Sequence, residues 1–262
     1  MNEIIKTYRS SKETTYNFAL CSIGLLIWAS FGYFLITVEQ TVLMSILPLM
    51  FYVIAFVLFF AIAALLFRAN AMGNMILISD VQFPHLNKMI IEGSKKLGLE
   101  SPPEAFLFNS NGLFNAFARK AMGHKYLMLT SSLVDATTDE QVKFVIGHEL
   151  GHHAAGHLSF IGFWLRFPAR IIPFLHKAYS RQCEFTCDKI GFYLSRDVDH
   201  SCSAIQMLGC GCQKLNTKMN LFAFEMQENL VPPTSGFISE IFRSHPRLTK
   251  RVAALRKVRL FD

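Results

Sequence analysis

The chain has 262 residues, a formal net charge of +7, a hydrophobic content of 52% and a charged content of only 17%. Its mean hydropathy of +0.31 exceeds that of ordinary soluble proteins and favours a membrane protein. No nucleic-acid-binding motif accompanies the positive charge, so we expect no nucleic-acid partner.

Two uncharged segments lie near the N-terminus. Residues 17–38 and 41–67 carry no charged side chain, and each can cross a hydrocarbon core of about 30 Å as a helix. Only Glu39 and Gln40 separate the two segments. We therefore predict a transmembrane helical hairpin over residues 1–68, with spans at about 17–38 and 41–67. A cleaved signal peptide is the alternative for the first segment, but a second span follows at once.

The charges beside the hairpin indicate its orientation. Lys6, Arg9 and Lys12 precede the first span, and Arg68 follows the second. Because positive residues favour the cytoplasmic side, we predict an integral membrane protein whose two termini and catalytic domain, residues 69–262, are cytoplasmic. The cysteines show no extracellular disulfide pattern, which fits a reducing compartment.

The chain after the hairpin combines helices with a few short strands. Residues 83–97 have the apolar spacing of an amphipathic helix. Residues 105–108, 113–118 and 126–129 are short apolar runs separated by Asn-Gly and Gly-His, which predicts a small antiparallel β-sheet. The remainder is predicted to be mostly helical, so the fold class is α+β.

Two later segments are less regular. Residues 158–175 are apolar but are interrupted by two arginines and two prolines. This segment is too short and too broken for two more spans, so we expect it to lie at the membrane surface or to line the core. Residues 232–236 contain two prolines and a glycine, which predicts a loop.

One predicted helix carries an HExxH sequence. Thr138 and Gln141 have the spacing of a capping box, which places a helix over about residues 139–157. His148 and His152 are four residues apart and share a helix face, so both rings can bind one zinc ion.

The residue after the first histidine is the expected base. Glu149 is close enough to His152 on the helix to reach a water on the same ion. Zinc lowers the pKa of such a water to near 7, and a carboxylate can accept its proton. The motif therefore predicts a zinc hydrolase.

The third ligand determines the class of the site. The metzincin extension, with a third histidine six residues after His152, is absent. His153 and His157 are predicted to face away from the metal, as packing or surface residues. Glu184 and Asp188 lie one helical turn apart. Glu184 can bind the metal while Asp188 orients a ligand histidine through its other ring nitrogen.

Two cysteines offer an alternative site. Cys183 and Cys187 have the same spacing as the acidic pair. With His148 and His152 they would form a closed structural zinc site that leaves no position for water. This alternative leaves Glu149 without a role.

Four motifs together resemble the membrane gluzincin peptidases of the HtpX-like and CAAX prenyl protease superfamily. The resemblance covers nearly all of the chain after the hairpin and rests on Asn115-Ala116-Phe117-Ala118, the HExxH helix, Glu184-x-x-x-Asp188, and Ser244-His245-Pro246 with Arg251. It implies a mostly helical zincin-type peptidase domain with one Zn²⁺ per chain.

The resemblance also implies roles for residues outside the ligand set. Asn115, Ala116 and Phe117 would hold an extended substrate on an edge strand beside the cleft. His245 and Arg251 would be catalytic residues that stabilise the developing oxyanion.

The implied activity is that of a zinc-dependent endopeptidase in membrane protein quality control. Its substrates would be membrane or misfolded polypeptides, and the lipid bilayer its other partner. The alternative is an inactive zinc-binding membrane adaptor. HtpX-like members usually have two further spans between HExxH and the glutamate, whereas thirty-one residues separate His152 from Glu184 here. We therefore expect a compact two-span relative; the sequence predicts no oligomeric state.

Overall fold

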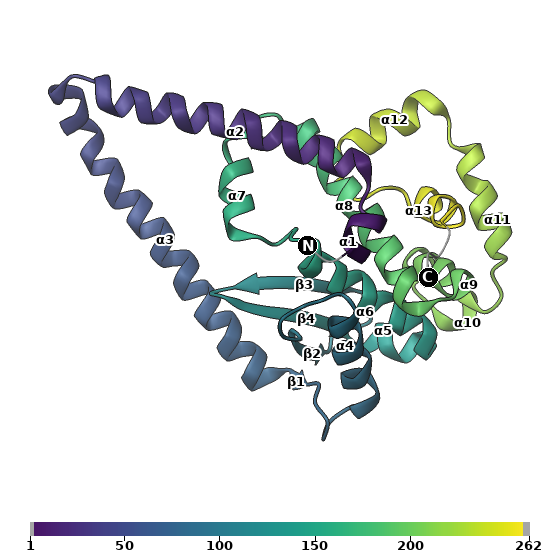
Figure 1. Cartoon of the computed structure of the whole chain (residues 1–262). Coiled ribbons are helices and arrows are strands. Elements are labelled where there is room, and N and C mark those ends of the chain that lie inside the picture. The colour runs from purple at the N-terminus through teal and green to yellow at the C-terminus, as the bar shows by residue number, and fades with distance from the viewer. Residues whose placement is uncertain (1–2, 259–262) are drawn as a thin grey trace.

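The computed structural model describes residues 3–258. After a short helix α1 (Glu3–Tyr8), two long helices α2 (Ser11–Thr37) and α3 (Gln40–Asn74) diverge from a tight turn like the arms of a V (Figure 1). Both helices have the length and hydropathy of membrane spans. Apart from Val38, which caps α2, the predicted spans lie within α2 and α3, and both helices extend beyond them toward the rest of the chain.

The four strands form one mixed sheet. The strands β1 (Ile76–Leu77), β2 (Glu104–Phe108), β3 (Ala116–Ala121) and β4 (His124–Thr130) follow the order β1-β2-β4-β3. The predicted α+β class is confirmed, but the prediction of an antiparallel sheet is wrong in one pairing, because β2 runs parallel to β4. The strands β3 and β4 form an antiparallel hairpin, and its second strand, β4, lies between β2 and β3.

The two faces of the sheet pack against different helices. Leu127 and Leu129 point toward α4 (Pro84–Lys96) and α6 (Asp139–Ala154), in the main hydrophobic core. Tyr126 and Met128 point the opposite way, toward the end of α3. Side chains alternate along a strand, so β4 joins the core to the second arm of the V.

Small residues bring α6 close to α8 (Pro173–Ser195). A Cβ atom on Gly147 would lie 2.9 Å from the Cα of Gly191, and one on Gly191 would lie 2.7 Å from the carbonyl oxygen of Phe144. The two helix backbones therefore touch where neither residue has a side chain. This contact places the Glu184 face of α8 opposite the HExxH face of α6.

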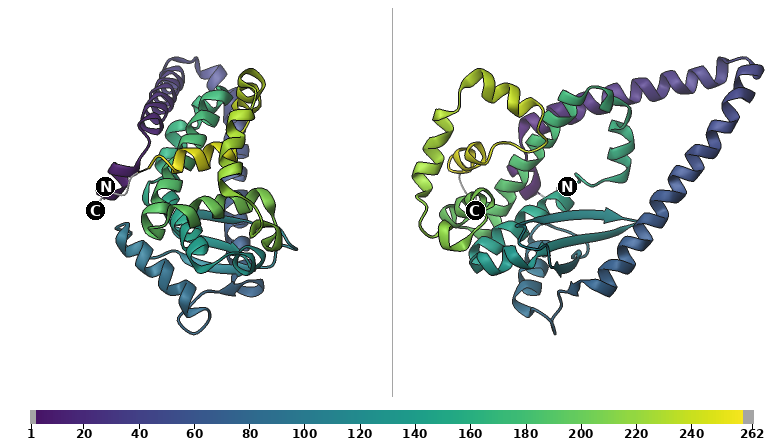
Figure 2. Two further views of the ribbon diagram at one scale, coloured as in Figure 1. Left: turned by 90° about the vertical axis from the view of Figure 1, so that its right-hand side faces the viewer. Right: turned by 180° about the vertical axis from the view of Figure 1, so that it is seen from behind.

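The other helices complete the domain. The C-terminal helices lie on the side of α8 away from the turn of the V (Figure 2). The predicted loop at residues 232–236 is instead the start of α12 (Pro233–Ile241), because Pro233 occupies the first helical turn, where its missing N–H is not needed. The remaining elements are α5 (Ser131–Ala136), α7 (Phe160–Arg166), η1 (Pro168–Ile171), α9 (Val198–Cys210), α10 (Gln213–Asn216), α11 (Leu221–Met226), η2 (Gln227–Leu230), α12 (Pro233–Ile241) and α13 (Leu248–Leu255).

Candidate metal centre

The HExxH helix begins with the predicted cap. The Thr138 hydroxyl accepts from the Gln141 N–H, and the Gln141 side chain accepts from the Thr138 N–H at 2.9 Å. This capping box satisfies two N–H groups at the start of α6. The last two turns of the helix carry His148, Glu149 and His152.

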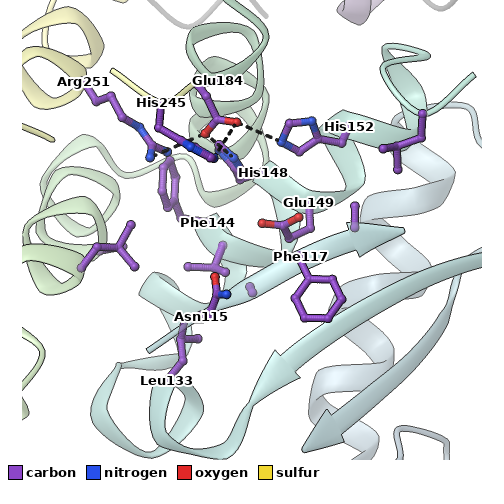
Figure 3. Close-up of a pocket in the computed structure, with 16 residues that line it drawn as sticks. Asn115, Phe117, Leu133, Phe144, His148, Glu149, His152, Glu184, His245 and Arg251 are labelled. Atoms are coloured by element: carbon purple, nitrogen blue, oxygen red, sulfur yellow. Dashed lines mark ion pairs between the residues drawn. The ribbon is translucent and has the colours of Figure 1, made fainter. Parts of the chain in front are cut away.

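A carboxylate from α8 lies opposite the two histidines (Figure 3). Glu184 Oε2 is 3.5 Å from His148 Nε2, and Glu184 Oε1 is 3.6 Å from His152 Nε2. Burial acts to raise the pKa of Glu184, but His148 and Arg251 hold it well below its usual value. Two imidazole nitrogens and an ionised carboxylate thus face one point between α6 and α8.

A buried ion pair supports the first histidine from behind. Asp188 Oδ1 accepts from His148 Nδ1 at 3.0 Å, and the two Asp188 oxygens accept from Arg251 at 2.6 and 2.8 Å. Burial acts to lower the pKa of His148, but its contacts with Asp188 and Glu184 raise it to about 10. With Nδ1 donating to Asp188, the Nε2 of His148 is directed toward Glu184.

Glu149 lies beside the edge strand. Its carboxyl group faces the cleft above β3 (Figure 3). Burial raises the pKa of Glu149 to about 7, against the opposing effects of the nearby His148 and of a hydrogen bond from the backbone of Ala118. A carboxyl group with a pKa near neutrality can both accept and release a proton at physiological pH.

The second histidine is supported by a residue that we predicted to face away. His152 Nδ1 lies 3.1 Å from His157 Nδ1, and His157 Nε2 lies 3.2 Å from Glu13 Oε1 on α2. Burial, followed by the charge of His148, lowers the pKa of His152 well below its usual value. A neutral His152 with Nε2 free for a metal has its proton on Nδ1, so it donates to His157, which in turn donates to Glu13.

The prediction that His157 lies on the opposite face of the helix from the two ligand histidines is wrong for a local reason. The helix α6 ends at Ala154, three residues earlier than predicted, and Gly156 has a φ of 78°. Glycine adopts this left-handed conformation without a steric penalty, and the chain turns back toward His152. His153 does face away, and its ring contacts the backbone oxygen of Tyr126 at 3.0 Å.

The two cysteines of the alternative site do not act as a pair. Cys187 Sγ lies within 4.8 Å of ring nitrogens of both His148 and His152, whereas Cys183 groups with Glu13 and His157. The Cys187 sulfur is also 3.6 Å from His157 Nδ1. Burial raises the pKa of the Cys187 thiol well above its usual value, and zinc binds the thiolate.

An open cleft of about 290 Å³ gives access to the cluster. The edge strand β3 forms one wall, and no further strand pairs with its outer edge within residues 3–258. His245 lies at the mouth, with a largely exposed side chain whose Nε2 is 3.6 Å from Glu184 Oε1. Among the sequence-predicted site residues, those that line the cleft are Asn115, Ala116, Phe117, His148, Glu149, His152, Glu184, His245 and Arg251.

The sequence did not single out the apolar residues of this cleft. Leu133, Phe144, Val145, Ala204 and Leu208 line it together with the polar residues. These residues come from three different helices, and their spacing is that of ordinary core residues. Only their convergence in space identifies them.

The donor set fits a zinc ion. Two imidazole nitrogens and one carboxylate are the ligands of a common class of catalytic zinc site, in which the fourth position is open. Here the donors face a cleft, and further polar residues hold Nδ1 of both histidines. His148, His152 and Glu184 are therefore the residues suited to hold the metal.

A protein-family model that matches most of the chain identifies its family. The model of the family described as peptidase family M48 matches residues 80–163 and 160–259. The chain belongs to peptidase family M48, and the resemblance inferred from its motifs is confirmed.

Two curated proteins are similar to this chain. It is 25% identical over 170 residues to plastoglobule-localized metallopeptidase 48, chloroplastic, of Arabidopsis thaliana, a match over 58% of this chain and 48% of that protein. It is 29% identical over 200 residues to protease HtpX of Psychrobacter sp. (strain PRwf-1), a match over 59% of this chain and 64% of that protein. The chain thus spans between about half and two thirds of the length of these relatives.

The fold is similar to that of a solved structure. The crystal structure of S. mikatae Ste24p matches with a TM-score of 0.53 and 18% identity, over 93% of this chain and 64% of that chain. The two apolar helices together with the HtpX relative indicate a membrane protein.

Proposed function

We propose that the protein is a membrane-bound zinc-dependent endopeptidase of the HExxH and ExxxD type. The observation that carries the proposal is the convergence of His148 Nε2, His152 Nε2 and the Glu184 carboxylate at one point, beside Glu149 and the open edge of β3. A zinc ion held there would supply a Lewis acid and a water of lowered pKa.

Each residue at the cleft has a distinct task in this proposal. Residues 115–117 bind an extended polypeptide by backbone hydrogen bonds along the edge of the sheet. Glu149 accepts a proton at its carboxylate and transfers it to the leaving amine. His245, at the mouth, donates to the carbonyl oxygen of the scissile bond as negative charge develops there.

Arg251 acts through its neighbours in this proposal. Its guanidinium bonds to the carboxylate of Asp188 and pairs with that of Glu184, at 2.6 to 3.7 Å. We assign it a positioning role: it holds Asp188, which orients the His148 ring, and it keeps Glu184 ionised.

The cellular setting follows from the anchor and from the resemblance. The positive residues beside the spans support a cytoplasmic position for both termini and the catalytic domain. Membrane or misfolded proteins are then the substrates that can reach a cleft at the membrane face. The protein would thus act in membrane protein quality control. A domain boundary near residue 68 separates the anchor from the peptidase.

The test uses the full chain purified in detergent, an unfolded protein substrate and the variant Glu149→Gln. We expect this variant to bind one zinc per chain and to lose activity by about 10²- to 10⁴-fold, the usual contribution of a general base. Chelation should abolish the activity of the wild type, and zinc should restore it.

Two results would contradict the proposal. Undiminished cleavage by Glu149→Gln would refute the role of Glu149. A wild-type protein that binds zinc stoichiometrically but cleaves no unfolded substrate would favour an inactive zinc-binding adaptor.

A further inference from the structure

An apolar surface outside the two candidate membrane spans lies beside α2. Residues 160–174, which we call the α7 segment, comprise α7, η1 and the first residues of α8. Phe160, Ile161 and Ile171 are 71 to 76% exposed, and four further members of the segment are exposed large apolar residues: Phe163, Phe167, Ile172 and Phe174. This exposure is inconsistent with the core-lining position that the sequence left open.

The α7 segment contacts the middle of a candidate membrane span. The carbonyl oxygen of Leu165 would lie 1.8 Å from a Cβ atom on Gly24 of α2, so only glycine allows this backbone contact. The Trp28 indole N–H of α2 donates to the carbonyl oxygen of Trp164 at 2.9 Å. Figure 1 shows α7 inside the V, with one end at α2.

The position of this contact along α2 gives its depth. Gly24 and Trp28 follow Asn17, the last strongly polar residue before the apolar part of α2, by seven and eleven residues. A helix rises 1.5 Å per residue, so the contacts lie roughly 10 and 16 Å beyond Asn17. Half of a hydrocarbon core is about 15 Å thick, so the contact at Gly24 lies within one leaflet and the contact at Trp28 lies near the bilayer midplane.

Of the two arginines in the segment, Arg166 has polar and aromatic partners at that depth, whereas Arg170 is exposed, with its guanidinium 5.5 Å from the Phe163 ring. Arg166 is only 8% exposed and donates to the Asn17 side chain at 2.8 Å, with its guanidinium 4.9 Å from the Tyr179 ring. The backbone continues with local hydrogen bonds through η1 into α8. A segment can enter a bilayer when its backbone groups bond internally.

From these observations we propose that the α7 segment is a re-entrant element that enters the leaflet on the domain side and leaves on the same side. Lipid acyl chains cover its exposed phenylalanine and isoleucine side chains, as they cover the adjoining face of α2. This inference rests on the proposed membrane anchorage. Leu158, just before the segment, lines the cleft, so the cleft opens at the bilayer surface.

Tryptophan fluorescence can test the depth directly, because Trp28 and Trp164 are the two tryptophans of the chain. The full-length variant Trp28→Phe, reconstituted into phosphatidylcholine vesicles, reports on Trp164 alone. We expect phosphatidylcholines brominated on their acyl chains to quench Trp164 by at least half, and aqueous acrylamide to quench it only weakly. Quenching by acrylamide without quenching by bromolipid would overturn the inference.

Matched variants separate the possible failures. Trp164→Phe leaves Trp28, which reports on the anchor itself. Quenching of Trp28 but not of Trp164 by bromolipid would refute the re-entrant segment alone, whereas unquenched Trp28 would refute the anchorage as well. If neither quencher reaches Trp164 and the chain crosslinks as a dimer, a second copy covers the segment and the inference is wrong.

A second reporter avoids the loss of the Trp28 hydrogen bond. Ile171→Trp, in a chain with both native tryptophans changed to phenylalanine, probes the most exposed large apolar residue of the segment. Phe222→Trp in the same background is the control, since Phe222 is 67% exposed on α11, at the side of the domain away from the V. We expect bromolipid to quench the Ile171→Trp reporter and acrylamide to quench the control.

Discussion

The ion pair behind the first histidine offers a test of how the site is held together. Asp188 is 2% exposed and accepts two hydrogen bonds from Arg251 and one from His148. The substitution Asp188→Asn keeps the volume but removes the charge, and it leaves the buried Arg251 without an ionised bidentate partner. Removing one partner of a buried pair costs about 3 to 5 kcal/mol, and the remaining amide oxygen favours the lower value.

That cost converts into a measurable change in melting temperature. For a domain of 150 to 250 residues, 1 kcal/mol corresponds to about 2 to 4 °C, so a loss of about 3 kcal/mol lowers the melting temperature by roughly 6 to 12 °C. The loss of the carboxylate that orients His148 should also weaken zinc binding by about 10- to 100-fold. Circular dichroism melts of the metal-free protein and zinc titration against a competing chelator measure the two effects.

An exposed aspartate paired with arginine is the matched control. Asp199 accepts from Arg256 at 2.5 Å, and its side chain is 70% exposed. Exposed pairs contribute about 0 to 1 kcal/mol, so Asp199→Asn should leave zinc affinity unchanged and the melting temperature nearly so. Our explanation of the site would be refuted if Asp188→Asn behaved like this control.

Three further predictions concern the same region. Because the pKa of His148 is raised to about 10, zinc must displace a proton from this histidine when it binds. Zinc affinity measured by chelator competition should therefore fall about tenfold for each unit decrease in pH, and an affinity independent of pH would contradict this. His157→Ala should weaken zinc binding about 10- to 100-fold, because it removes the partner of His152 Nδ1. His153→Ala should leave zinc binding unchanged, because the His153 ring contacts the backbone oxygen of Tyr126 instead of a ligand histidine. Gly147→Ala should destabilise the domain by about 1 to 3 kcal/mol in thermal melts, whereas Gly73→Ala, with open space around it, should not.

The local patterns in this chain were strong enough to predict its main elements. The two uncharged runs, the capping box at Thr138 and the HExxH spacing each depend on residues within a few turns of one helix. Such features require no knowledge of distant contacts. The segment that carries Glu184 and Asp188 was expected to be helical like most of the remaining chain, and on a helix a spacing of four residues places both on one face.

The contacts that hold His152, through His157 and Glu13, could be recognised only from the tertiary structure. Whether His157 packs against His152 depends on where α6 ends. Gly156, which directly follows the C-cap Ala155 in a left-handed conformation, is not distinguishable by pattern from a glycine within a continuing helix. Glu13 lies 144 residues from His157 in the chain. No local pattern can place a buried carboxylate of the anchor helix next to a histidine of the metal centre.

The amino-acid sequence by itself determined the chemistry of this protein: which side chains can bind a metal, which can move a proton, and which segments can enter a membrane. Only the tertiary structure decided how these parts meet. The mixed order of the sheet, the glycine contact of Gly147 with Gly191, and the packing of α7 on Gly24 all depend on backbones far apart in the chain. Residue spacing specifies a helix face, whereas close packing between distant elements specifies what that face contacts.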